Sequence, residues 1–284
     1  MKTLVKALVC AVALISAPSL VSAQIGFTVA DFNGGAPQRL YRFDVNDGIM
    51  EDLGVIETNA EQEGLFSVGS LLFGYSENDP ALATDDERNP GTRILPFPGA
   101  NAPNLLGVAP NINRRVCAAG AAAQFGTESG AGYNPVDGYV YVVNSNDNPN
   151  DGVVGSRFFR FKPGCTGFQQ IGPQSAVSVD GLAVDPNGTV YVSDFRISDR
   201  IYRLNTTTGA LTPIGSLGFP INRDSGLAWD FENNRLLGLA ENGVIYVINT
   251  TTGVGTILST LTLNGGAAPT DLEGFDIPQQ DPIP

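Results

Sequence analysis

The chain repeats one pattern of residues four times: a pair of apolar residues, Arg or Val, another apolar residue, a polar turn with Gly, and a second apolar segment. The copies occupy residues 40–56, 158–172, 201–215 and 245–258. A supersecondary unit that recurs at about 45 residues cannot bury its apolar face alone, so it has to pack on its neighbours. The repeat therefore predicts a fold assembled from similar units side by side.

A second pattern alternates with these copies: a short apolar segment, a tight turn and a β-rich segment. Its copies occupy residues 63–79, 131–147, 180–195 and 225–243. In the turn at 185–188, Pro presets φ and Gly accepts the positive φ that closes a hairpin. Residues 189–193 alternate with the period of a strand, and no segment after residue 23 keeps a helical period. Together the two patterns give four strands a unit, which is the blade of a β-propeller.

One glycine anchors the start of each predicted innermost strand. These glycines are Gly64, Gly132, Gly181, Gly226 and Gly274. The first gap between them is the longest, because residues 109–129 form an insertion rich in Ala and Gly. Residues 24–56 supply only the three outer strands of a blade, and 272–278 supply an innermost strand, so the two ends complete one blade. We expect an all-β propeller of five four-stranded blades, closed by pairing of the N- and C-terminal strands, or of six if the long gap holds a degenerate unit.

The first 23 residues have the form of a secretory signal peptide. Lys2 and Lys6 form a charged start, 7–15 are apolar, and 21–23 give a cleavage site of small residues. The alternative is an uncleaved membrane anchor, but the apolar run is shorter than the roughly 20 residues that span a bilayer. We expect a signal peptide at 1–23, a propeller domain at 24–278 and a short tail at 279–284. The chain should then be secreted, or periplasmic in a Gram-negative bacterium.

Composition limits both partners and chemistry. The net charge of −13 argues against nucleic acid and anionic membranes as partners. An extracellular protein, a glycan or a small molecule remains, and the chain is expected to be a monomer. The chain has no histidine, which excludes Ser-His-Asp and Cys-His sites and the usual zinc sites. Cys117 and Cys165 predict one disulfide in an exported chain.

The residue before each anchoring glycine should line the mouth of the channel, where the innermost strands start. These residues are Glu63, Ala131, Asp180, Ser225 and Glu273. Carboxylates that converge there repel one another, which raises their pKa values unless a cation neutralises them. A hard ion with oxygen ligands, Ca²⁺ before Mg²⁺, would suit such a site. We therefore take Glu63, Asp180, Ser225 and Glu273 as candidate metal ligands. The alternative is that these side chains only fix the strand starts by hydrogen bonds to neighbouring blades.

Three further residues are candidates for binding. Asp224 and Asp271 lie close to the predicted rim in the sequence. Trp229 is the one tryptophan and falls on a predicted innermost strand, where it could pack between blades or stack on a sugar ring.

The segment 180–194, DGLAVDPNGTVYVSD, resembles the repeat of the NHL and senescence-marker/gluconolactonase-like propellers. Over nearly all of 24–278 the chain is similar to secreted repeat proteins that are known only as domains of unknown function. The gluconolactonase-like resemblance implies a divalent metal held by a Glu before Gly, here Glu63 or Glu273, and by the Asp of an Asp-Gly pair, here Asp180. A third ligand in that family is Asn, and Ser225 stands in its place here, which departs from the catalytic pattern.

Three functions are consistent with these observations. The first is a secreted, non-catalytic propeller that acts as a binding or interaction scaffold. The second is a Ca²⁺-dependent hydrolase, similar to lactonases and esterases, with its acidic site at the channel mouth. The third is a carbohydrate-binding propeller, in which pairs of carboxylates would act on the sugar.

Overall fold

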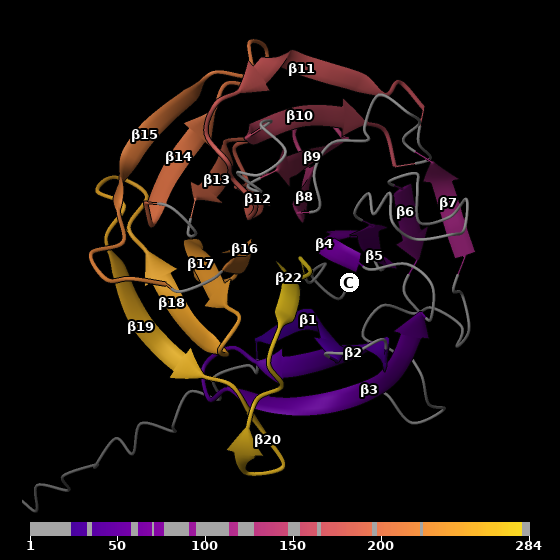
Figure 1. Cartoon of the computed structure of the whole chain (residues 1–284), viewed down its shortest axis with the longest axis vertical. Helices are drawn as coiled ribbons and strands as arrows, with labels where there is room; N and C mark the ends of the chain where they lie inside the picture. The colour runs from indigo at the N-terminus through magenta and orange to yellow at the C-terminus, as the bar shows by residue number, and fades with distance from the viewer. Residues whose placement is uncertain are drawn as a thin grey trace, which may run out of the picture.

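The structure is a computed structural model in which five β-sheets stand around a central axis (Figure 1). It describes residues 24–32, 36–57, 62–69, 71–76, 91–94, 114–118, 128–146, 154–163, 166–194, 198–221 and 224–279. The predicted signal peptide and nearly all of the predicted tail lie outside these ranges. Every regular element within them is a β-strand, and the fold is an all-β propeller. None of the described residues belongs to a helix of the length and apolarity that a membrane span requires.

Four sheets have the four-stranded form of a regular blade, with antiparallel neighbours. The first holds β4 (Gln62–Val68), β5 (Leu71–Ser76), β6 (Gly91–Ile94) and β7 (Arg114–Ala118). The second holds β8 (Glu128–Asn134), β9 (Tyr139–Asn146), β10 (Gly155–Phe161) and β11 (Gln169–Ser175). The third holds β12 (Leu182–Val184), β13 (Val190–Asp194), β14 (Arg200–Leu204) and β15 (Leu211–Ser216). The fourth holds β16 (Asp224–Asp230), β17 (Arg235–Ala240), β18 (Val244–Ile248) and β19 (Gly255–Thr260).

The remaining sheet joins the two ends of the described chain. Its strands, from the centre outwards, are β22 (Leu272–Asp276), β1 (Ile25–Phe32), β2 (Ala36–Asp44), β3 (Ile49–Glu57), β20 (Thr262–Leu263) and β21 (Gly266–Ala267). Strand β22 pairs with β1 in antiparallel register, with Phe27 opposite Asp276 and Val29 opposite Glu273. The predicted closure of the ring by both termini is therefore confirmed.

The same sheet corrects the predicted strand count. We expected five four-stranded blades, but only four described sheets have that form, because β20 and β21 extend the closing sheet to six strands. Strand β20 runs parallel to β3, and the Thr262 amide donates to the Gly48 carbonyl at 2.8 Å. The hairpin thus pairs part of an outer edge that would otherwise leave its backbone groups open. In the long gap after Gly64, β6 and β7 complete the sheet of β4, and the described residues form no sixth sheet.

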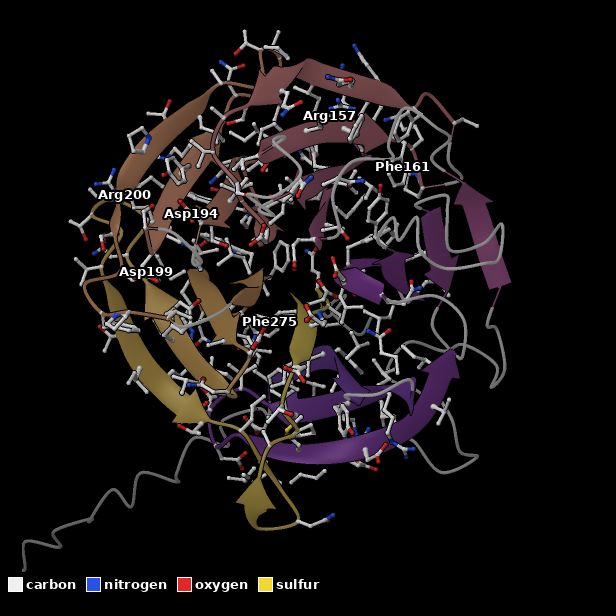
Figure 2. The ribbon with its side chains drawn as sticks, viewed as in Figure 1. Arg157, Phe161, Asp194, Asp199, Arg200 and Phe275 are labelled. Carbon is white, nitrogen blue, oxygen red and sulfur yellow. The ribbon has the colours of Figure 1, made fainter. Side chains whose placement is uncertain are left out.

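The hydrophobic core lies between neighbouring sheets, where side chains fill the space (Figure 2). Phe275, near the centre of the ring, packs with Phe43 of its own sheet and with Leu237 and Leu239 of the next. Because both faces of a middle strand meet another sheet, β13 is buried along its whole length. The outermost strand β15 is largely part-exposed or exposed. This contrast explains why the middle strands read as nearly continuous apolar runs.

Candidate functional site

Among the residues that the structure describes, one cavity lies at each end of the innermost strands. The first, here named the acidic cavity, measures about 20 Å³ and is lined by the first residues of these strands. Glu63, Glu128, Asp180 and Glu273 all line it. Glu63 is only 7% exposed, whereas the other three carboxyl residues are half-buried. Sequence reasoning thus placed Glu63, Asp180 and Glu273 together correctly, and it did not identify Glu128.

Metal binding at the acidic cavity stays a prediction. Its carboxylate oxygens are the ligand type that Ca²⁺ prefers. Within the part of the chain that the structure describes, however, no three His, Cys, Asp or Glu side chains form a group that could hold a metal ion. The donor chemistry therefore fits Ca²⁺, but the placement of the side chains does not.

The anchoring glycine of the β8 sheet lies two residues earlier than predicted. Gly132 pairs with Tyr141, whereas the matching tyrosine of the next sheet, Tyr191, pairs with Ala183. Gly132 is therefore the counterpart of Ala183, and Gly130 holds the anchoring place. A Cβ at Gly130 would lie 2.0 Å from the backbone oxygen of Asp180, just before β12, which is why this position needs glycine.

This shift changes the residue at the rim. Ser129, not Ala131, precedes the anchoring glycine and is buried at the acidic cavity. Ala131 lines both cavities from the middle of the strand. A sequence signal was available, because Gly130 and Gly181 each stand five residues before a proline, Pro135 and Pro186, respectively.

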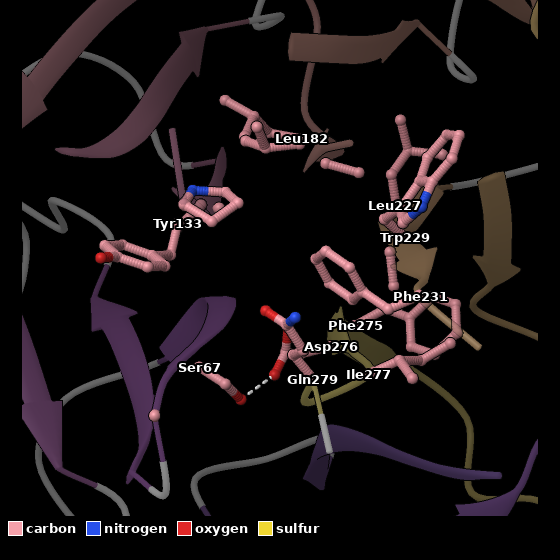
Figure 3. Close-up of a pocket in the computed structure, with 17 residues that line it drawn as sticks. Ser67, Tyr133, Leu182, Leu227, Trp229, Phe231, Phe275, Asp276, Ile277 and Gln279 are labelled. Carbon is pink, nitrogen blue, oxygen red and sulfur yellow. Dashed lines mark hydrogen bonds between the residues drawn. The ribbon is translucent and has the colours of Figure 1, made fainter. Parts of the chain in front are cut away.

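The second cavity, here named the aromatic cavity, measures about 80 Å³ and lies at the other ends of the innermost strands (Figure 3). The rings of Tyr133, Trp229, Phe231 and Phe275 line it, together with the carboxyl of Asp276. Asp276 stands two residues after its anchoring glycine, where the other innermost strands have Phe66, Gly132, Ala183 and Ala228. A carboxyl at a position where the equivalent strands have no charged residue was the sequence signal for Asp276. We did not use this signal.

The carboxyl of Asp276 has a strongly raised pKa. Burial raises the pKa of its carboxyl to about 6, while hydrogen bonds from the Ser67 hydroxyl and the Ile277 amide lower the pKa in part. The Ser67 hydroxyl donates to Oδ2 of Asp276 across two sheets, from β4 to β22 (Figure 3). The carboxyl is thus held by neutral donors in a poorly solvated place.

Trp229 packs inside the molecule. Its residue is 8% exposed, and its ring stacks on Tyr191 of the neighbouring sheet with centroids 5.9 Å apart. Its indole nitrogen is buried and has no hydrogen-bond partner among the described residues. Trp229 lines the aromatic cavity, which lies at the opposite end of the channel from the acidic cavity.

The other predicted site residues fall outside these cavities or outside the described side chains. The strand β16 contains Asp224 and Ser225, whose side chains are not described. Asp271 lies just before β22 with a positive φ of 57° and lines neither cavity. Cys165 lies outside the described residues, and Cys117 is described only as part of the β7 backbone. The predicted disulfide is therefore not tested.

Several solved structures are similar to this chain at low sequence identity, and the one in the nidogen/laminin complex shares its fold. A chain in the crystal structure of a nidogen/laminin complex is 12% identical, with a TM-score of 0.55, and the match covers 90% of this chain and 99% of that one. A protein described as a candidate gluconolactonase is 16% identical, with a TM-score of 0.49 and coverage of 85% and 82%. A streptogramin B lyase is 10% identical, with a TM-score of 0.43 and coverage of 79% and 62%. At 12% identity the likeness to the nidogen/laminin chain shows the fold alone.

Sequence comparison assigns a family without a known activity. No curated protein matches this chain significantly. A family model described as a repeat of unknown function matches residues 115–271, which is more than half of the chain. The expected likeness to propeller repeat proteins of unknown function is thereby confirmed, and the chain belongs to the family of repeats of unknown function named DUF6923.

Proposed function

We propose that the protein is a non-catalytic β-propeller that acts as a binding scaffold. The size of its channel supports this function most directly. The two cavities measure about 80 and about 20 Å³, whereas sites for drug-sized ligands measure roughly 300–1,000 Å³. A chain without histidine also lacks the commonest general acid and base. The channel can therefore take a small group, while a larger partner would have to bind outside it.

The fold is compatible with this proposal. The nidogen/laminin structure, whose chain shares the fold, is that of a complex between proteins. Export is part of the proposal and rests on the signal-like residues 1–23. Fractionation of the producing cells, with N-terminal sequencing of the exported protein, tests it. A mature N-terminus at Gln24 is expected, and retention of the uncleaved chain inside the cell would contradict it.

The first prediction is the absence of turnover. With lactones and aryl esters as substrates and Ca²⁺ present, the protein should give no more product than its Asp180→Asn variant. The reason is that the acidic cavity has no space for a substrate beside its four carboxyl residues. Product formation that depends on Asp180 would refute the non-catalytic proposal.

A second candidate, a Ca²⁺-dependent hydrolase similar to lactonases and esterases, is favoured by one observation. One cavity is lined by carboxyl residues from four different sheets: Glu63, Glu128, Asp180 and Glu273. Such convergence is the arrangement expected of an oxygen-lined cation site. The described placement forms no metal-binding group, so this function ranks second. A glycan site at Trp229 has less support, because that ring stacks on Tyr191 inside the fold.

The second prediction separates these candidates by thermal melting. We expect the melting temperature to be the same in Ca²⁺ and in a chelator. A cation site that is filled at about 100 times its Kd would add about 2.7 kcal/mol to the free energy of unfolding. A stabilisation of that size that is lost in Asp180→Ala and kept in Asp271→Ala would favour the hydrolase over the non-catalytic scaffold. Asp271 is the matched control, because it lines neither cavity.

A further inference from the structure

We propose that the aromatic cavity binds a compact organic cation, of which an alkylammonium group is the type. The proposal rests on the binding function proposed above and gives that function a ligand class and a site. The cavity is defined by Tyr133, Trp229, Phe231, Phe275 and Asp276, and it lies at the opposite end of the channel from the acidic cavity.

The size and opening of the cavity suit a small group. One water needs roughly 10–15 Å³ of cavity volume, so a cavity of about 80 Å³ holds on the order of five to eight waters. A trimethylammonium group is of this size. Pro135 and Gln279 line the cavity and are exposed, so the cavity communicates with the surface of the ring.

The charge of the cavity calls for a cation. Asp276 is the single charged residue among the described residues that line it, and none of them is Lys or Arg. Its hydrogen-bond partners, the Ser67 hydroxyl and the Ile277 amide, are neutral. Asp276 is half-buried, and carboxylates that are withdrawn from water in proteins are usually paired with a positive charge. A bound cation would supply the partner that the described lining residues do not.

The rings favour an organic cation over a metal ion. Figure 3 shows Phe275, Phe231 and Trp229 on one side of the Asp276 carboxyl and Tyr133 on the other. Ring faces attract ammonium groups within about 6 Å, and alkylated ammonium groups also gain from burying their carbons. Ca²⁺ usually takes several carboxylates among its six to eight oxygen ligands, and the described lining residues supply one, Asp276.

Trp229 gives a second, independent observation. Its indole N–H is buried and has no acceptor among the described residues. A buried donor without an acceptor is costly, and a bound group or water that accepts from it is one explanation for such a donor in a native protein. A cation that carries a hydroxyl, such as choline, offers an acceptor for this N–H as well as a charge for Asp276.

Isothermal titration with choline and with its neutral isostere 3,3-dimethyl-1-butanol tests the proposal at about pH 8, where Asp276 is ionised. Choline should bind at least about tenfold more tightly than the isostere, because only choline pairs with the carboxylate. Asp276→Asn should weaken choline binding by about tenfold or more. Glu273→Gln, the same change of carboxyl to amide in the acidic cavity, should leave it unchanged.

A parallel titration with the blocked amino acids N-acetyl-lysine methylamide and its trimethylated form identifies the source of the cation. Binding of choline alone indicates a free small molecule, and binding of the lysine derivatives indicates a side chain of a partner protein. Equal affinity for choline and its isostere, no effect of Asp276→Asn, or no binding of any of these cations at millimolar concentration would overturn the proposal. The non-catalytic function is decided separately by the turnover assay.

Discussion

Replacement of Gly274 by alanine is expected to lower the free energy of unfolding by about 3 kcal/mol, from strain and overpacking together. Gly274 lies on β22, the strand that closes the ring, with a positive φ of 59°. A Cβ there would lie 2.4 Å from the carbonyl oxygen of Glu63 and 2.8 Å from Cγ of Leu65, both on β4. Backbone atoms of a buried strand cannot move aside as the tip of a side chain can. The innermost strands of the two sheets would therefore be pushed apart.

Two control variants separate strain from contact. Gly69→Ala has the same kind of backbone, with a φ of 56°, but a Cβ there would have nothing within 4 Å. It should cost about 1 kcal/mol. Gly266→Ala, at the outer edge, has no positive φ and a nearest atom at 3.5 Å, so it should be almost neutral. Urea denaturation with a constant m-value measures all three. If Gly274→Ala costs no more than Gly69→Ala, the close contact of β22 with β4 does not contribute to stability.

The closure of the ring could be predicted because the repeat leaves an incomplete blade at each end of the chain, and the missing strands can be counted. Residues 24–56 have three strands and residues 272–278 have one, and only pairing of these segments completes a unit. The extra hairpin β20–β21 was missed because two-residue strands carry no apolar period. Its turn was nevertheless encoded, since Asn264 and Gly265, with φ of 53° and 76°, form the Asn-Gly pair typical of a two-residue hairpin.

The site could be predicted only where its position follows from the repeat. Glu63, Asp180 and Glu273 reach one cavity because each precedes an anchoring glycine. In β8, Gly130 and Gly132 lie on the same face of the strand, since side chains alternate with a period of two. The local pattern could not choose between them, and only the distance to Pro135 does. Because Gly132 was taken as the anchoring glycine, Glu128 and Ser129 were not predicted to lie at the acidic cavity.

Asp276 was harder to predict, because its chemistry depends on its surroundings. The sequence shows a carboxyl where other sheets have Phe66, Gly132, Ala183 and Ala228. The raised pKa comes first from burial, and burial is decided by how five sheets meet at the channel. A residue-by-residue comparison of the repeats could therefore have identified Asp276 as unusual, but not as an acid with a raised pKa.

The largest stabilising change that we predict is Asp276→Asn. The pKa of the carboxyl is about 6 in the folded protein, against an ordinary value of 3.8. Each unit of pKa corresponds to about 1.4 kcal/mol, so ionisation of Asp276 costs the folded state up to about 3 kcal/mol. The amide is neutral at every pH and can still accept the hydrogen bond from the Ser67 hydroxyl. At pH 8 the variant should therefore melt about 5–10 °C higher than the wild type.

The pH dependence gives this prediction its sign and its test. Below about pH 3 the carboxyl is largely protonated in both folded and unfolded chains, so wild type and Asp276→Asn should be equally stable there. Between about pH 4 and 6 the unfolded chain loses the proton first, and the wild type loses stability relative to the variant as the pH rises. Above about pH 7 the difference is constant. Melting curves of both proteins from about pH 5 to pH 8 measure it, and Glu273→Gln is the control for removal of a negative charge from the channel. A difference that is the same at every pH would show that the amide acts through packing, and a destabilised variant would show that the folded protein needs the charge of Asp276.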